Sequence, residues 1–235
     1  MLNNNWVAFV VTLALALLWL RLNDFLAHRG LISAALSRKI IHIGTGPIYV
    51  LCWLLFNQSP WSRYIAALIP FGITLQFLLV GIGVIKDQAA VDAMSRSGDR
   101  REILRGPLFY GIVFVVLTLV YWLETPIGII ALMLLCGGDG LADIVGTRMS
   151  GASLPWSRKK TWYGSLAMFF GGWLLALFVL AVYWKVGVFG GGFADYLLRI
   201  TIISLGASIV ESLPFRDIDN ITVPLVAVLL GHLLF

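Results

Sequence analysis

The sequence is poor in charged residues. Only 12% of its 235 residues are Asp, Glu, Lys or Arg, whereas soluble domains carry about 25%, and 60% are hydrophobic. This deficit excludes a soluble globular domain and indicates an integral membrane protein. Because lipid cannot satisfy backbone polar groups, the apolar blocks must form helices or a closed barrel. The blocks are continuous rather than alternating, so we expect one all-α polytopic membrane helix bundle, with residues 1–235 as a single domain.

Other absences exclude several kinds of site. Two cysteines, Cys52 and Cys136, make neither a disulfide framework nor a zinc site, and the three histidines do not form a metal-ligand set. No G-x-x-x-x-G-K-[ST] and no G-x-S-x-G occurs, which excludes a P-loop and a hydrolase nucleophile elbow. The net charge of +5 fits anionic headgroups or nucleotide phosphates. The bases form no stripe interleaved with aromatic residues, so no nucleic acid is expected as a partner.

Targeting features are missing from the first residues. The apolar residues 6–20 follow Asn3, Asn4 and Asn5, where a secretory signal would have a basic region. No segment rich in Arg and Ser precedes them either. We therefore expect a bacterial chain or a fully mature form.

Eight apolar runs approach the length of a membrane span, which is about 20 residues for a helix. They are 5–22, 40–57, 63–85, 107–123, 126–145, 163–185, 194–213 and 220–235. Seven spans are also possible, because the second and the last runs are short. The fifth run is interrupted at Gly137 and Gly138 and then carries Asp139 and Asp143. This pattern favours a helix that enters the protein interior or a wet cavity rather than one that faces lipid.

The Lys and Arg residues predict the orientation. All but three of the seventeen fall in the alternate loops after the first, third, fifth and seventh runs; the exceptions are Arg63, Lys185 and Arg199. By the positive-inside rule these alternate loops lie in the cytoplasm, and both termini lie on the non-cytoplasmic side. The charge-dense loops therefore share the membrane face at which nucleotide triphosphates are available.

Charges of both signs gather in residues 136–165. Asp139 and Asp143 are four residues apart and face one way on a helix, a spacing at which two carboxylates can hold a divalent cation. Pairing with a base such as Arg148 is the alternative. Arg158, Lys159 and Lys160 precede the next helix and offer a phosphate site. They could equally be membrane anchors.

Three more polar segments flank apolar runs. In the segment SRKIIH, Arg38 and His42 share a helix face next to Lys39 and could clamp a phosphate. The alternative is that Arg38 and Lys39 are ordinary anchors and His42 is a packed polar residue. Glu102 and Arg105 lie one turn apart in a loop that could also be a solvated linker. The segment after 210 offers further oxygen ligands, unless it is an acidic loop with a helix cap. Its candidates are Glu211, Asp217, Asp219 and Asn220.

Together these segments resemble the phytol kinase branch of the polyprenol (dolichol-type) kinase family of membrane lipid kinases. The matching elements occur in family order over 37–225: SRKIIH, REILRGPLFYG, GGDGLADIVGTR, LPWSRKKTWYGS and ESLPFRDIDNITVPL. Ile218 separates Asp217 from Asp219 where the family is expected to have an acidic pair, so either acid could be the functional one. Phosphatidate cytidylyltransferases have similar loops and provide an alternative, and a small membrane transporter is a second one.

The resemblance implies phosphorylation of phytol or a related isoprenoid alcohol, with CTP as donor and Mg²⁺ as cofactor. In photosynthetic organisms this reaction salvages phytol towards tocopherol, which suggests a cyanobacterial-like inner or thylakoid membrane. On this hypothesis Asp139 and Asp143 hold Mg²⁺, and His42 or a carboxylate, Glu211 or Asp219 among them, accepts the alcohol proton. The candidates for nucleotide and phosphate binding are Arg38, Lys39, Arg105, Arg148, Lys159, Lys160 and Asn220. The sequence does not specify the oligomeric state.

Overall fold

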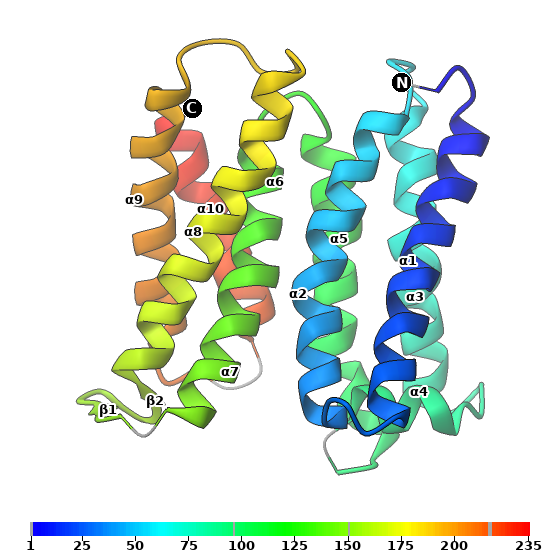
Figure 1. Cartoon of the computed structure of the whole chain (residues 1–235), viewed down its shortest axis with the longest axis vertical. Coiled ribbons are helices and arrows are strands. Elements are labelled where there is room, and N and C mark those ends of the chain that lie inside the picture. The colour runs from blue at the N-terminus through cyan, green and yellow to red at the C-terminus, as the bar shows by residue number, and fades with distance from the viewer. Residues whose placement is uncertain (1, 96, 150, 216–217) are drawn as a thin grey trace.

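The computed structural model is a bundle of long helices (Figure 1), and it describes all residues except 1, 96, 150 and 216–217. In chain order the described elements have the following bounds. They are α1 (Asn5–His28), α2 (Ala34–Cys52), η1 (Trp53–Leu55), α3 (Ser62–Ile82), α4 (Gln88–Met94), η2 (Arg100–Leu104), α5 (Gly106–Tyr121), α6 (Ile127–Met133), η3 (Leu134–Asp139), α7 (Gly140–Arg148), β1 (Ser153–Leu154), β2 (Ser157–Thr161), α8 (Trp162–Lys185), α9 (Phe193–Glu211) and α10 (Asp219–Leu234).

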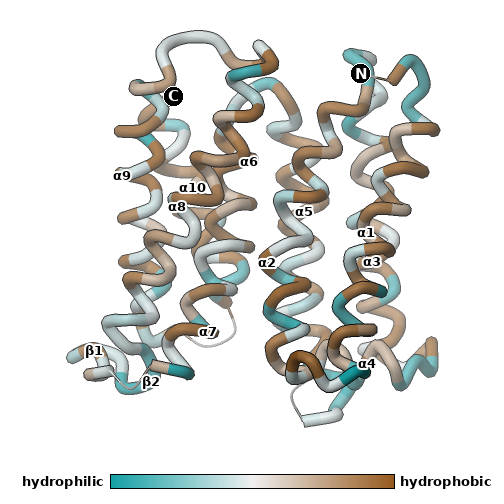
Figure 2. Tube along the Cα trace, viewed as in Figure 1, coloured by the Kyte–Doolittle hydropathy of each residue, from teal (hydrophilic) through white to brown (hydrophobic). Residues whose placement is uncertain are grey.

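The helical bundle confirms the predicted fold class. Six of the described helices are long and apolar enough to cross a membrane, and α6, η3 and α7 form one of them. The 19-residue α2 and the 16-residue α10 correspond to the two runs that are short in the sequence. Figure 2 shows apolar segments along the helices and hydrophilic ones mostly towards the two ends of the bundle. Whether all eight runs cross the membrane stays a prediction.

Both termini lie at the same end of the bundle, and the chain segments rich in Lys and Arg lie at the other end (Figure 1). That second end carries α4, the end of α7, the β1–β2 hairpin and the α9–α10 connection. The structure thus brings together the loops that the charge pattern assigns to one membrane face. Which compartment faces them remains a prediction.

The fifth apolar run lies in the middle of the bundle and is not broken. All residues from Ile127 to Gly138 are buried, and the helix widens into a π-helical turn, η3, where an interruption was predicted. The glycines serve close packing instead: a Cβ on Gly171 of α8 would lie 2.8 Å from the carbonyl oxygen of Gly137. The prediction that this run enters the protein interior is therefore confirmed, and the predicted break is wrong.

Two short elements were not predicted. The helix α4 follows α3, which ends at Gly83 with a positive φ of 87°. The strands β1 and β2 form an antiparallel hairpin between α7 and α8, so the basic segment Arg158–Lys160 lies on a strand. Thr161 caps α8 by accepting a hydrogen bond from the backbone N–H of Gly164. One of the backbone N–H groups that the phosphate site would use is therefore already bonded.

Candidate active site

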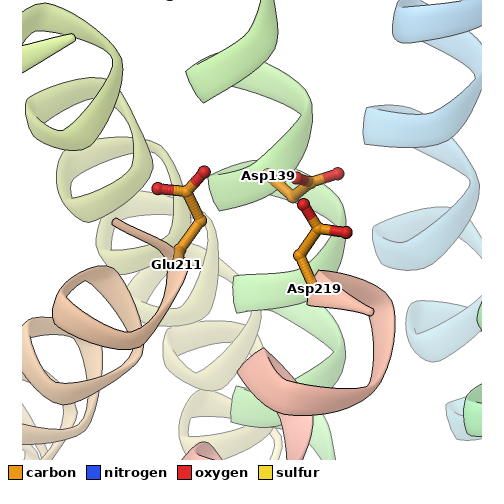
Figure 3. Close-up of side chains that lie close together, drawn as sticks. All are labelled: Asp139, Glu211 and Asp219. Carbon is orange, nitrogen blue, oxygen red and sulfur yellow. The ribbon is translucent and has the colours of Figure 1, made fainter. Parts of the chain in front are cut away.

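Three carboxylates converge near the end of the bundle that carries the hairpin. One oxygen each of Asp139, Glu211 and Asp219 lies within 4.8 Å of the others. Asp139 ends η3, Glu211 ends α9, and Asp219 begins α10, so three segments far apart in the sequence build one cluster (Figure 3). Glu211 is the most enclosed, with 7% of its surface exposed. Carboxylates this close repel one another unless a cation neutralises them.

Lys160 supplies one positive charge to this cluster. Its Nζ lies 2.6 Å from Glu211 Oε1 and 3.9 Å from Asp219 Oδ2, and it also donates to the backbone carbonyl of Glu211. The hairpin that carries Lys160 is fixed to the same end of α9, because Trp156 Nε1 donates to the Ser212 carbonyl at 3.1 Å. The hairpin thus places one lysine against two of the three acids.

The helix α2 borders the other side of the cluster. His42 Nε2 lies 3.2 Å from the Leu135 carbonyl oxygen and 3.5 Å from Asp139 Oδ2. One turn earlier, Lys39 Nζ lies 2.8 Å from Asp143 Oδ2. Lys39 and His42 are therefore turned towards the two aspartates of the GGDGLAD segment. Arg38, which was predicted to share a helix face with His42, forms no ion pair with either aspartate among the described contacts.

Asn220 connects the cluster to the segment that begins α5. Its Nδ2 donates to the Gly106 carbonyl oxygen at 3.1 Å, directly after Arg105. Its Oδ1 is buried and has no hydrogen-bond partner among the described residues. Next to Asp219, this oxygen is available to a ligand. All five polar segments named from the sequence therefore meet at this end of the bundle.

The charges around the cluster do not balance. Asp139, Asp143, Glu211 and Asp219 supply four carboxylates, while Lys39 and Lys160 supply two ammonium groups. Two negative charges are left in excess among these six side chains. Partly buried carboxylates in excess favour a bound divalent cation, because its charge offsets their repulsion and their hard oxygens suit Mg²⁺.

The structure distributes the predicted site residues unevenly. Asp143 lies outside the three-carboxylate group and pairs with Lys39. The structure therefore does not group it with Asp139, its partner in the predicted metal pair. Arg38 is half-buried and forms no ion pair with another described residue. Four bases are exposed on the surface: Arg105, Arg148, Arg158 and Lys159. Asp217, the alternative to Asp219, lies outside the described residues.

Sequence reasoning missed two residues beside the cluster, Tyr110 and Cys136. Tyr110 lies under the His42 ring, with 4.5 Å between ring centroids, and its hydroxyl lies 3.1 Å from Cys136 Sγ. Both belong to apolar stretches, where a lone tyrosine and a small buried cysteine are ordinary. Only their position next to His42 distinguishes them.

The fold and the cluster together define an integral membrane enzyme. No family model and no solved structure matches the chain. Curated plant proteins do. The "Probable phytol kinase, chloroplastic" of Triticum aestivum is 41% identical over 90% of this chain and 71% of its own length, and that of Zea mays is 40% identical over 92% and 72%. The "Phytol kinase 1, chloroplastic" of Arabidopsis thaliana is 36% identical over 90% and 70%. The chain therefore belongs to the phytol kinase family, as its motifs predicted.

These relatives correct the predicted source. The expectation of a bacterial, cyanobacterial-like membrane is wrong, because these relatives are plant proteins named as chloroplastic. That expectation combined the lack of a targeting segment in the first residues with a reaction found in photosynthetic organisms, and neither observation distinguishes a bacterial membrane from a chloroplast membrane. The prediction of a multi-pass membrane protein agrees with the apolar helices.

Proposed function

We propose that the protein transfers the γ-phosphoryl group of CTP to the hydroxyl of phytol or a related isoprenoid alcohol, in the salvage of phytol towards tocopherol. Membership of the phytol kinase family supports the phosphorylation of phytol. The observation that carries the proposal is the meeting of Asp139, Glu211 and Asp219 with Lys160 at one end of the bundle. Phosphoryl transfer calls mainly for this kind of charge neutralisation and alignment.

The location of the cluster suits a substrate that is part lipid and part alcohol. Glu211 ends α9 and Asp219 begins α10, while Asp139 lies within the span Ile127–Arg148, and the three meet towards the end of the bundle that carries the hairpin. An isoprenoid tail can remain among or beside the apolar helices while its hydroxyl reaches the acids. The nucleotide, which is excluded from lipid by its charge, arrives from the aqueous side of the same end.

Magnesium is the cofactor that we propose for this site. Asp139, Glu211 and Asp219 would hold it, and the unpartnered Oδ1 of Asn220 adds a further oxygen of the type that Mg²⁺ prefers. The ion, when bound, neutralises charge on the phosphate oxygens. Among the protein's own groups, Lys160 would neutralise the triphosphate from the hairpin side. Arg38 and Lys159, which form no ion pair with another described residue, would add positive charge.

The candidates for accepting the proton of the alcohol are His42 and the carboxylates of the cluster, and we propose a carboxylate. The Leu135 carbonyl oxygen can only accept a hydrogen bond, so His42 Nε2 carries the proton in the 3.2 Å contact between them. His42 is therefore a hydrogen-bond donor towards the cluster. A carboxylate of the cluster is the better proton acceptor for the attacking hydroxyl.

The proposal is tested with purified protein in lipid nanodiscs, labelled CTP, and separate reactions with phytol, geranylgeraniol, farnesol and dolichol. We expect a prenyl monophosphate and CDP, with phytol among the substrates, and no transfer when Mg²⁺ is chelated. Release of pyrophosphate with phosphatidate as acceptor would instead indicate a cytidylyltransferase. Equal rates with ATP would contradict the assignment of CTP as donor.

A further inference from the structure

A partly buried polar junction lies beside His42 and is not used in the proposed chemistry. Tyr110 of α5 donates its hydroxyl proton to the His42 carbonyl oxygen of α2 at 3.1 Å. The same hydroxyl lies 3.1 Å from Cys136 Sγ in η3, whose S–H can donate in return. One tyrosine hydroxyl thus ties three segments together, α2, α5 and η3.

The ring of Tyr110 fixes the neighbouring imidazole as well. It lies against His42 at 4.5 Å between centroids, with 37° between the ring planes. His42 then directs its Nε2–H at the Leu135 carbonyl and towards Asp139 Oδ2, both in η3. Tyr110 therefore contacts His42, and His42 in turn contacts Asp139.

The segment that receives these contacts is the π-helical turn η3. In a π-helical turn each backbone carbonyl accepts a hydrogen bond from the N–H of the fifth residue ahead. This geometry is rare and occurs mostly at functional sites. The turn spans Leu134–Asp139 and ends on the acid itself. The backbone of α2 approaches closely at Gly46, where a Cβ would lie 2.3 Å from Cys136 Sγ. The junction therefore clamps the turn against α2.

We propose that Tyr110 is a positioning residue for Asp139: through its bonds to His42 and Cys136 it holds the π-helical turn in the orientation that aims the carboxylate at Glu211 and Asp219. This inference rests on the proposed function, in which those three acids hold the metal ion. Outer contacts that orient metal ligands typically contribute 10–100-fold to metal affinity. Loss of the Tyr110 hydroxyl should therefore weaken cation binding without affecting the isoprenoid alcohol.

The test compares Tyr110→Phe with Tyr49→Phe. Tyr49 provides a matched control, because it is a buried tyrosine whose hydroxyl likewise joins three helices. It connects α2 to α3 and α5 through the Ala66 carbonyl and Thr118, both at 3.1 Å. Binding of Mn²⁺ alone, without nucleotide or alcohol, is measured by electron paramagnetic resonance. For Tyr110→Phe we expect the dissociation constant to rise by about ten-fold, with an unchanged KM for phytol. For Tyr49→Phe we expect the wild-type constant, whatever the loss of thermal stability.

Further variants separate positioning from simple destabilisation. Cys136→Ala removes the same junction from the side of η3 and should weaken Mn²⁺ binding in the same direction, which also provides a test if Tyr110→Phe does not fold. His42→Gln keeps a donor near Leu135 and should retain more Mn²⁺ affinity than His42→Ala. Wild-type affinity in both Tyr110→Phe and Cys136→Ala would contradict the positioning role alone. Wild-type protein that binds no Mn²⁺ and phosphorylates no alcohol would contradict the proposed function itself.

Discussion

Asp139 is the residue on which the site depends most. Its Oδ2 lies 3.5 Å from His42 Nε2, it ends the π-helical turn, and it belongs to the three-carboxylate cluster. These contacts would hold the Asp139 carboxylate in a fixed position while charge develops on the phosphate oxygens. Removing one preorganised electrostatic group from an active site costs about 2.7–4 kcal/mol of transition-state stabilisation.

Asp139→Asn should therefore lose at least about 2–3 kcal/mol, or roughly a hundred-fold in kcat/KM, in assays with CTP and phytol. The matched control is Asp195→Asn, which changes an exposed aspartate in the first turn of α9, at the opposite end of that helix. Its activity should stay at the wild-type level. Full activity of Asp139→Asn would rule out the proposed role in cation binding.

Lys160 should matter more for the nucleotide than for the alcohol. A hydrogen bond to a charged group contributes about 1.5–3 kcal/mol, so Lys160→Ala should raise the KM for CTP by at least about ten-fold and change that for phytol little. The variant also leaves the buried Glu211 without its partner, so thermal unfolding is measured in parallel. Lys185→Ala, at the far end of α8, controls for loss of a lysine. An unchanged KM for CTP would argue against the assignment.

At the scale of elements, the close contact between α8 and η3 explains why glycines lie next to the site. An added Cβ on Gly171 would lie 2.8 Å from the carbonyl oxygen of Gly137, which is backbone and cannot rotate away. Small residues at such contacts let membrane helices approach closely. The acid at the end of η3 is thus carried by a segment with little freedom to shift.

Gly171→Ala should destabilise the protein by about 1–3 kcal/mol, because overpacking forces the two helices apart. Gly72→Ala in α3 is the matched control: a Cβ there meets no atom within 4 Å, and alanine is the better helix former. Thermal unfolding in detergent should therefore show a lower midpoint for Gly171→Ala and an equal or higher one for Gly72→Ala. The reverse order would contradict the packing of α8 on η3.

The elements also show where prediction from sequence stops. The apolar runs predicted the long helices to within a few residues at most ends, because burial of a hydrophobic face and backbone pairing in lipid leave little choice. The ends of α1 and α2 differ more; α2 begins at Ala34, after its cap Ser33, rather than at 40. The hairpin was missed because Arg158, Lys159 and Lys160 look like any basic flank of a membrane helix.

At the scale of the whole molecule, the two ends of the bundle differ in charge. The termini lie at one end, and the acid cluster lies towards the end with the hairpin and α4 (Figure 1). Since the positive-inside rule acts on short loops, the bundle should insert with a single orientation. The nucleotide should then reach the cluster from one side of the membrane only.

Cysteine labelling in sealed vesicles checks this orientation. An impermeant maleimide should label Asn3→Cys from one side and Ser153→Cys, in the hairpin, from the other. Both native cysteines are buried and give the background of the unmodified protein. CTP added on the Ser153 side should support transfer. Labelling of both positions from the same side would contradict the predicted arrangement of the spans.

The sequence by itself determined that this is a membrane helix bundle, how its basic loops divide between two ends, and to which family it belongs. These properties follow from the composition of continuous segments and from local motifs. Only the tertiary structure decided that Glu211 and Asp219, rather than Asp143, join Asp139, and that Lys39 pairs with Asp143. The physical reason is that both pairings arise between segments distant in the chain. The packing of α9 and α10 on η3, and of α2 on α7, brings those segments together. Spacing along the sequence does not predict such packing.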